Sequence, residues 1–383
     1  MAVYSQLSLS NRSSCLCQTS TTYLALPVLY IAMFLTGLSG NILSLWVFLA
    51  KISTKTSTHI YIINLGISNL ILCLTMPFTA AYYVLGTSWP TPSLLCQLAI
   101  NVLTPVLHAN IGGGMLILTW LAISRFATLT QHNYGNRPSR CTKVLPYVFF
   151  SRMPQPKFAL AMCLGTWAFV AMAIIPTVVI YSTMETGKTE NTSEQICYNV
   201  AVEAGDSGSQ AFAKVGISLF FVCLLLVLSA YLAVIRHFHR NQISTATSDR
   251  RKVYSRVVRN IVVIQIVMVV CLLPHHIFKA IFINLALHYS KYGEHLSECH
   301  PLSKYVEIKN VLLCLAVLRC STDPFIYLLL DRKFKMHVCA LFRGSSNTKE
   351  SHSSRTFECG QLNQYDSGTV KQAVNQDEQS HLN

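Results

Sequence analysis

The stretch VGISLFFVCLLLVLSAYLAVI, residues 215–235, holds 21 consecutive residues without a charged side chain. An α-helix rises about 1.5 Å per residue, so this stretch is long enough to cross the roughly 30 Å hydrocarbon core of a bilayer. Apolar helices buried in soluble proteins are usually shorter than this. The stretch therefore predicts a membrane protein.

The composition of the whole chain agrees. Of the 383 residues, 52% are hydrophobic and 12% are charged, whereas roughly a quarter are charged in soluble domains. Because the bilayer core offers no water to the backbone, each long apolar run is expected to form a helix. The sequence predicts an all-α fold, a seven-transmembrane helical bundle. Its expected spans are residues 23–50, 60–85, 94–128, 158–181, 211–237, 257–287 and 306–330.

The segments on either side of the bundle, 23–330, are polar. Residues 1–22 lack an apolar segment followed by a small-residue cleavage site, so they are expected to remain as an extracellular head. Residues 344–383 are rich in Ser, Thr, Gln and Asn without apolar periodicity. This composition is typical of a disordered segment, here a cytoplasmic tail.

Residues 331–343 differ from that tail. They place Phe334 and Val338 on one helical face and basic residues elsewhere, which predicts a short amphipathic eighth helix on the inner membrane surface. Cys339 within this helix is either palmitoylated or an unmodified cysteine.

The distribution of Lys and Arg predicts the orientation, because positively charged loops stay cytoplasmic. One side carries 18 such residues in the first, third and fifth loops and the tail, and the other carries four in the N-terminal segment and its loops. The N-terminus is therefore expected outside. The net charge of +14 then faces the anionic lipids of the inner leaflet and cytoplasmic partners, not nucleic acid. The sequons at Asn11 and Asn191 fall on the outside, as glycosylation requires.

The sequence gives little support for an enzyme or a transporter. The spans contain almost no carboxylates, and no HExxH or comparable metal pattern is present, so neither an enzyme nor a cofactor is expected. The chain also lacks the internal repeat that is typical of many transporters.

Short motifs recur across the spans in a fixed order. They resemble the landmarks of the rhodopsin-like, class A, G-protein-coupled receptor superfamily, over about residues 25–342. The landmarks are Gly40-Asn41, Asn64-Leu-Gly-Ile-Ser-Asn69 with Pro77, Leu121-Ala-Ile-Ser-Arg-Phe126, Trp167 with Pro176, Tyr231, Cys271-Leu-Leu-Pro274 and Asp323-Pro-Phe-Ile-Tyr327.

The resemblance implies a plasma-membrane receptor that couples to heterotrimeric G proteins, with arrestin and receptor kinases acting on its tail. It assigns G-protein contact to Arg125; the alternative is an arginine that only extends to the interface. Pro274 and Pro324 are the expected hinges, since proline removes a backbone hydrogen bond, and Tyr327 belongs to the same switch. An opsin is excluded, because Val317 stands where retinal would need a lysine.

The resemblance also implies two disulfides on the oxidising extracellular face. Cys96 is expected to pair with Cys197 in the second outer loop. A second bridge would join the N-terminus to the third outer loop at Cys299. Its partner is either Cys15 or Cys17, and the sequence does not choose between them.

Among receptors, the sixth and seventh spans are similar to those of the purinergic nucleotide group. That group carries Pro-x-His-x-x-Lys/Arg in span six and a further Lys in span seven, matched here by Pro274, His276, Lys279 and Lys309. The resemblance implies an outer pocket that binds an unknown, small anionic extracellular ligand. The alternative is that both lysines extend to the headgroups and the histidines are hydrogen-bonded packing.

The middle of the bundle departs from the family pattern. Relatives usually carry Asp at position 69, a small hydroxyl residue at 114 and Asn at 319, which together with Asp323 surround a sodium ion. Here Asn69, Gly114 and Arg319 occupy those positions, so we expect Arg319 to replace the ion and pair with Asp323; the alternative is an Arg319 that faces lipid or another cavity. Ser124 also replaces the usual acidic partner of Arg125, and both changes favour basal signalling.

One rival remains within the same fold. A receptor-shaped protein could have lost G-protein coupling and serve as a scaffold or as an arrestin-only receptor. Nucleotide exchange on a panel of G proteins separates the two.

Overall fold

The structure, a computed structural model, describes residues 16–86, 94–133, 152–186, 198, 200–205, 207–241, 259, 262–292 and 299–346. Both sequons, Cys15, Cys197 and the tail beyond residue 346 lie outside these ranges, so the predictions that concern them stay predictions. Within the described residues, all regular secondary structure is helical. The all-α expectation is confirmed.

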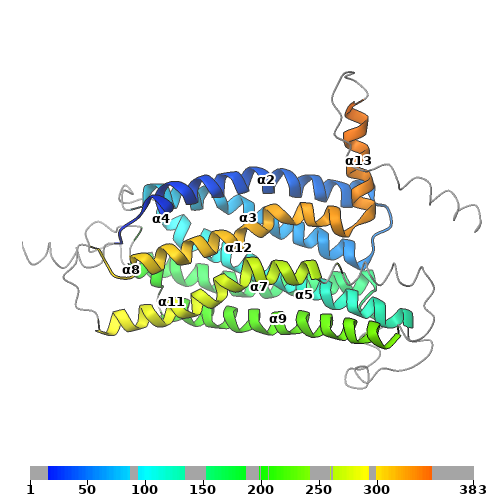
Figure 1. Cartoon of the computed structure of the whole chain (residues 1–383). Coiled ribbons are helices and arrows are strands. Elements are labelled where there is room, and N and C mark those ends of the chain that lie inside the picture. The colour runs from blue at the N-terminus through cyan, green and yellow to red at the C-terminus, as the bar shows by residue number, and fades with distance from the viewer. Residues whose placement is uncertain are drawn as a thin grey trace, which may run out of the picture. The chain divides into compact units, whose positions relative to one another are not determined.

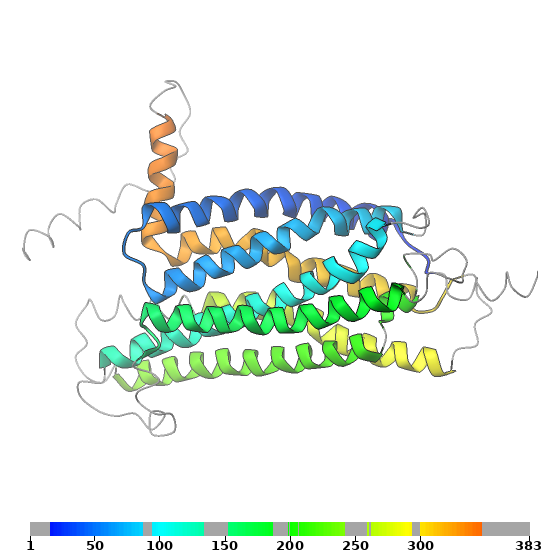
Figure 2. The ribbon, with the colours of Figure 1, turned by 180° about the vertical axis from the view of Figure 1, so that it is seen from behind.

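Among the described residues, seven helices are long and apolar enough to cross a membrane, and each overlaps one predicted span. Figures 1 and 2 show them side by side along one direction, within the unit that ends at Asp331. The described helices that form the spans are Thr21–Lys51 (with α2, Leu26–Trp46), α3 (Ser57–Leu85), α4 (Leu94–Leu98) continued by α5 (Thr104–Asn133), α7 (Pro156–Thr186), α9 (Ser207–Asn241), α11 (Leu273–Tyr292) and α12 (Ser303–Leu330).

The outward faces of these helices carry large apolar side chains. Leu225, Val215 and Phe325 are each more than 60% exposed. A soluble protein rarely exposes so much apolar surface. These faces therefore suit lipid, and the chain is a multi-pass membrane protein.

Glycines allow α2 to approach two neighbours closely. A Cβ at Gly37 would stand 2.7 Å from Cys73 Sγ on α3, and one at Gly40 would stand 2.9 Å from Pro324 Cγ on α12. Both distances are shorter than real Cβ contacts. Small residues at such points let transmembrane helices gain contact over their backbones.

The two expected hinges coincide with interrupted helical hydrogen bonding. Pro324 has no N–H for the carbonyl of Cys320, four residues earlier, and Asn41 Nδ2 of α2 donates to that carbonyl at 2.8 Å instead. Pro274 lies two positions after the end of a π-helical turn, Met268–Leu272. A wider turn of this kind accommodates an unpaired carbonyl before a proline.

A histidine links the start of α3 to the end of α12. Thr56 caps α3: its side chain accepts from the His59 N–H, and its own N–H donates to His59 Nδ1. Since Nδ1 accepts, Nε2 carries the proton in the neutral ring and donates to Asp331 Oδ2 at 2.9 Å. The two helices are thus fixed to each other at this end.

A second unit begins after Asp331. Its described part contains helix α13, Arg332–Ser346, which confirms the short eighth helix and extends it by three residues beyond 343. Its place on the membrane and the palmitoylation of Cys339 stay predictions.

Candidate functional site

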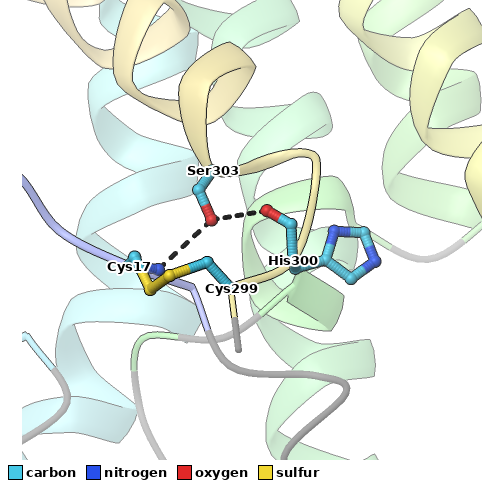
Figure 3. Close-up of a disulfide and its surroundings, with 4 residues drawn as sticks. All are labelled: Cys17, Cys299, His300 and Ser303. Atoms are coloured by element: carbon cyan, nitrogen blue, oxygen red, sulfur yellow. Dashed lines mark hydrogen bonds between the residues drawn. A yellow bond between two sulfur atoms is a disulfide. The ribbon is translucent and has the colours of Figure 1, made fainter. Parts of the chain in front are cut away.

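We call the end of the bundle near Ser303 the outer end, because the charge distribution predicts it to be extracellular. There the N-terminal segment is bonded covalently to the loop before α12. Cys17 and Cys299 form a disulfide, and Ser303 Oγ accepts from Cys17 N and donates to the His300 carbonyl (Figure 3). Cys17, not Cys15, is therefore the partner of Cys299.

The same segment contacts two helices. Gln18 Nε2 donates to the Tyr83 carbonyl of α3 at 3.1 Å, and Thr19 donates to the Glu307 carboxylate of α12. Cys96, at the start of the third span, is also disulfide-bonded. Its expected partner lies outside the described residues.

Lys309, an expected ligand residue, is bound by the chain itself. Its Nζ donates to Glu203 Oε2 at 2.5 Å and to the Glu203 carbonyl at 2.8 Å, and it lies 4.9 Å from the centre of the Phe282 ring. Glu203 belongs to a short loop helix, α8 (Val200–Ala204). Its other oxygen, Oε1, accepts from Tyr82 OH of α3 at 2.8 Å. We call Tyr82, Glu203 and Lys309 the outer cluster.

Tyr198 extends the outer cluster. Its ring lies 5.8 Å from that of Tyr82, and its side chain is buried. Burial, aided by the nearby Glu203 carboxylate, raises the pKa of the Tyr198 hydroxyl above its usual range. This tyrosine therefore stays neutral beside the cluster.

His276 and Lys279, the other expected ligand residues, lie on α11 and differ in their surroundings. His276 is buried, stacks on Phe220 with ring centres 4.1 Å apart, and shares a 2.9 Å hydrogen bond with the Leu272 carbonyl. His276 is therefore a hydrogen-bonded packing residue, as the alternative to ligand contact expected. Lys279 is half-buried, and no hydrogen-bond or ion-pair partner is found for it among the described residues.

Two further histidines, which the sequence did not single out for ligand contact, accompany Lys279. His275 is 3% exposed, and its Nδ1 has no hydrogen-bond partner among the described residues. His108 of α5 lies 6.2 Å from His275, ring centre to ring centre, and shares a hydrogen bond with the Thr104 carbonyl. On α11, Lys279 follows His275 by four positions and His276 by three, so the three side chains lie on one helical face. Imidazoles therefore lie beside Lys279.

The middle of the bundle holds a charged pair. Arg319 is 1% exposed and is the largest fully buried side chain of the described residues. Its Nη1 donates to Asp323 Oδ2 at 3.0 Å. The same oxygen accepts from Asn69 Nδ2 at 2.8 Å, and Asn69 also donates to Asn41 Oδ1 at 3.2 Å. We call Asn41, Asn69, Arg319 and Asp323 the polar core.

The absence of a side chain at residue 114 makes room for the guanidinium. A Cβ built on Gly114 would stand 3.1 Å from Arg319 Cζ and closer still to Nη2. Arg319 therefore faces the bundle interior and not lipid. A sodium ion does not fit these residues, because a permanent cation already binds the carboxylate oxygen that would hold it.

The opposite, inner end of the bundle contains Arg125, which is half-buried on α5. Its neighbour Ser124 lies 3.5 Å from Ser57 of α3, hydroxyl to hydroxyl, and Tyr327 packs edge-on against Phe48. The hydroxyl pair stands where the family usually places an acid next to this arginine. The hydrogen bond between His59 and Asp331, which the sequence did not predict, also lies at this end.

The predicted residues thus form three groups: the outer cluster with Lys279, the polar core, and the inner end. Among the described residues, no group of three His, Cys, Asp or Glu side chains is placed to hold a metal ion. The sequence missed Tyr82, Glu203 and His59 as partners. Glu203 offered a signal, since acidic residues are few in this chain and it lies six positions after the expected bridge cysteine Cys197.

Comparisons with known proteins match this arrangement. The model of the 7 transmembrane receptor (rhodopsin family) matches residues 40–327. The chain is 37% identical over 340 residues to the probable G-protein coupled receptor 82 of Homo sapiens, covering 88% of this chain and 98% of the relative. Its counterpart in Mus musculus is 38% identical, with 88% and 100% covered. A purinoceptor of Rattus norvegicus is 26% identical, with 84% and 80% covered.

Proposed function

The chain belongs to the rhodopsin family of seven-transmembrane receptors, which are not enzymes, and we propose that it transmits the binding of a small anionic ligand at its outer end to a heterotrimeric G protein at its inner end. The ligand proposal rests mainly on the environment of the Lys279 ammonium. The side chain is half-buried on α11, and the described residues offer it no ionic partner. A cation in such low-dielectric surroundings attracts an anion more strongly than one in water.

The proposed orientation, with the N-terminus outside the plasma membrane, has two supports. The Cys17–Cys299 bridge lies at the outer end, and disulfides persist in oxidising compartments. The Lys and Arg residues are concentrated at the opposite end, which is typical of cytoplasmic loops. Arrestin and receptor kinases would then reach the tail from the cytoplasm.

The polar core supports basal signalling. Sodium at this site would favour one state of the bundle, whereas Arg319 belongs to the chain and cannot dissociate. At the inner end, a hydroxyl pair replaces the acid that the family usually sets beside Arg125. An ion pair between positions 124 and 125 cannot form, and the loss of that pair lowers the free energy of the active state relative to the inactive state.

The test is nucleotide exchange on a panel of purified G proteins by the full-length chain in lipid nanodiscs. We expect exchange above that of empty nanodiscs without any ligand, and loss of this exchange in Arg125→Ala. A folded wild-type chain that activates no member of the panel would contradict coupling, and would favour a scaffold or arrestin-only receptor.

The ligand part needs its own measurement. Screening anions for increased exchange should yield agonists whose potency falls at least about tenfold in Lys279→Gln, since one direct ion pair is lost. Unchanged potency in that variant, with normal surface expression, would refute the anion site.

A further inference from the structure

The outer cluster removes one of the two pocket lysines from ligand binding. The side chains of Lys309 and Glu203 are 16% and 7% exposed, and the ammonium donates to both a carboxylate oxygen and the carbonyl of the same glutamate. Tyr82 satisfies the second carboxylate oxygen. The cluster is therefore a complete carboxylate site that the chain fills with its own residue.

The charge left for a ligand follows from this pairing. Lys279 and Lys309 are positive, and Glu203, which is paired with Lys309, is negative. Glu307 accepts from Thr19 and is not part of this pair. The hydrogen bonds of His108 and His276 to backbone carbonyls use their Nδ1 atoms. In the neutral rings these atoms carry the protons, which makes each Nε2 an acceptor without charge. Lys279, Lys309 and Glu203 together therefore carry one net positive charge, which is that of Lys279.

From this arrangement we propose that Glu203 determines the charge of the ligand: by neutralising Lys309, it restricts the receptor to small monocarboxylates and excludes anions with two or three charges. The proposal rests on the anion site of the proposed function and narrows its ligand class. A second ligand charge would find Lys309 already paired and Glu203 repelling it, and like charges placed together strongly lower affinity.

The rings beside the cations are already packed within the protein. Phe282 and Phe220 are 2% and 0% exposed, and they contact Lys309 and His276. The probes should therefore share one body and differ only in charge. Benzene carboxylates meet this condition.

The test uses three probes that share one ring and differ in charge: benzoate, isophthalate and benzene-1,3,5-tricarboxylate. Each is titrated against purified full-length receptor in nanodiscs at fixed ionic strength, and binding is measured as the rise in thermal unfolding temperature. We expect wild type to bind benzoate at least about tenfold more tightly than isophthalate, with the tricarboxylate weakest, because each added charge is unpaired.

Glu203→Gln is the decisive variant. The amide keeps the shape of the side chain, an oxygen for Tyr82 and the backbone carbonyl for Lys309, while it frees the charge of Lys309. We expect the isophthalate-to-benzoate affinity ratio to rise at least about tenfold. The double variant Glu203→Gln/Lys309→Gln restores the net charge and should restore the wild-type preference, which makes a closed double-mutant cycle.

Glu307→Gln is the matched control, since it removes a carboxylate at the same end that does not contact Lys309. Its ratio should stay near that of wild type, because separated charges are screened by salt. The proposal is overturned if wild type binds isophthalate as tightly as benzoate, or if Glu203→Gln and Glu307→Gln change the ratio equally.

Lys279→Gln separates this proposal from the one it rests on. If this variant abolishes benzoate binding while Glu203→Gln leaves the ratio unchanged, the anion site stands and charge selection by Glu203 fails. If benzoate binding survives Lys279→Gln, or if none of the three probes stabilises any variant, both proposals fail.

Discussion

Helix α12 supplies the cation of two carboxylate pairs that differ in almost every other respect. Arg319 pairs with Asp323 four positions away on the same helix, and the two side chains are 1% and 3% exposed. Lys309, about 15 Å nearer the outer end, pairs with Glu203 of a loop helix 106 positions away. The first pair lies within a single helix, whereas the second depends on where the loop places α8.

The largest effect is expected from breaking the buried pair. Asp323→Asn leaves the Arg319 charge uncompensated in the interior, which should lower the free energy of unfolding by about 3–5 kcal/mol. The thermal unfolding temperature of purified receptor measures this loss. The control is Arg319→Met/Asp323→Asn, in which no charge remains buried. If the single variant is as stable as the double variant, the pair is not a fixed element of the core.

The next effect concerns the covalent support of the outer end. Cys17→Ser/Cys299→Ser should cost about 2–4 kcal/mol, a common value for a disulfide that closes a long loop. Because the bridge joins the N-terminal segment to the start of α12, the outer cluster should weaken while the polar core persists. The unfolding temperature measures the loss of stability, and the affinity for benzoate measures the weakening at the outer end. Cys15→Ser should change neither, and an equal loss in that variant would contradict the assignment of the bridge.

A smaller effect tests the space beside Arg319. Gly114→Ala places a Cβ against the guanidinium and should cost about 1–3 kcal/mol by overpacking. Gly112 lies on the same helix, α5, and a Cβ there would meet nothing within 4 Å. Gly112→Ala should therefore stabilise the helix by about 0.5–1 kcal/mol. The unfolding temperature should fall below that of wild type in Gly114→Ala and rise above it in Gly112→Ala. Equal shifts in the two variants would argue against the tight fit beside Arg319.

The smallest effect on stability is expected at the outer cluster. Glu203→Gln should cost about 1 kcal/mol, between the values for exposed and buried pairs, because Lys309 is partly exposed and keeps the backbone carbonyl. A loss as large as that of Asp323→Asn in the same unfolding assay would erase the distinction between the two pairs.

Most of the fold could be predicted from the sequence, because span length and the absence of charge follow directly from the physics of the bilayer. Each of the seven spans falls where the apolar runs are, and the short helix after Asp331 follows from its periodicity. The Arg319–Asp323 contact was predictable as well, since residues four apart on a helix share a face.

The outer cluster could not be predicted in the same way. Periodicity carries no information on which loop residue meets Lys309, because Glu203 reaches it through a loop whose path depends on tertiary packing. The pair of His59 and Asp331, which are 272 positions apart, is hidden for the same reason. The choice between Cys15 and Cys17 likewise depends on the folded path of the N-terminal segment, because the two cysteines are only two positions apart.

We propose that Arg319 stands in place of a sodium ion in the polar core. The test is the unfolding temperature of purified full-length receptor in sodium chloride and in N-methylglucamine chloride at equal ionic strength, since a bound ion stabilises the folded state. The variant Asn69→Asp/Arg319→Asn, which restores two of the three replaced family residues, serves as a positive control and should gain stability selectively in sodium. We predict equal unfolding temperatures for wild type in the two salts. A rise specific to sodium in wild type would show that the ion still binds, and would refute the replacement by Arg319.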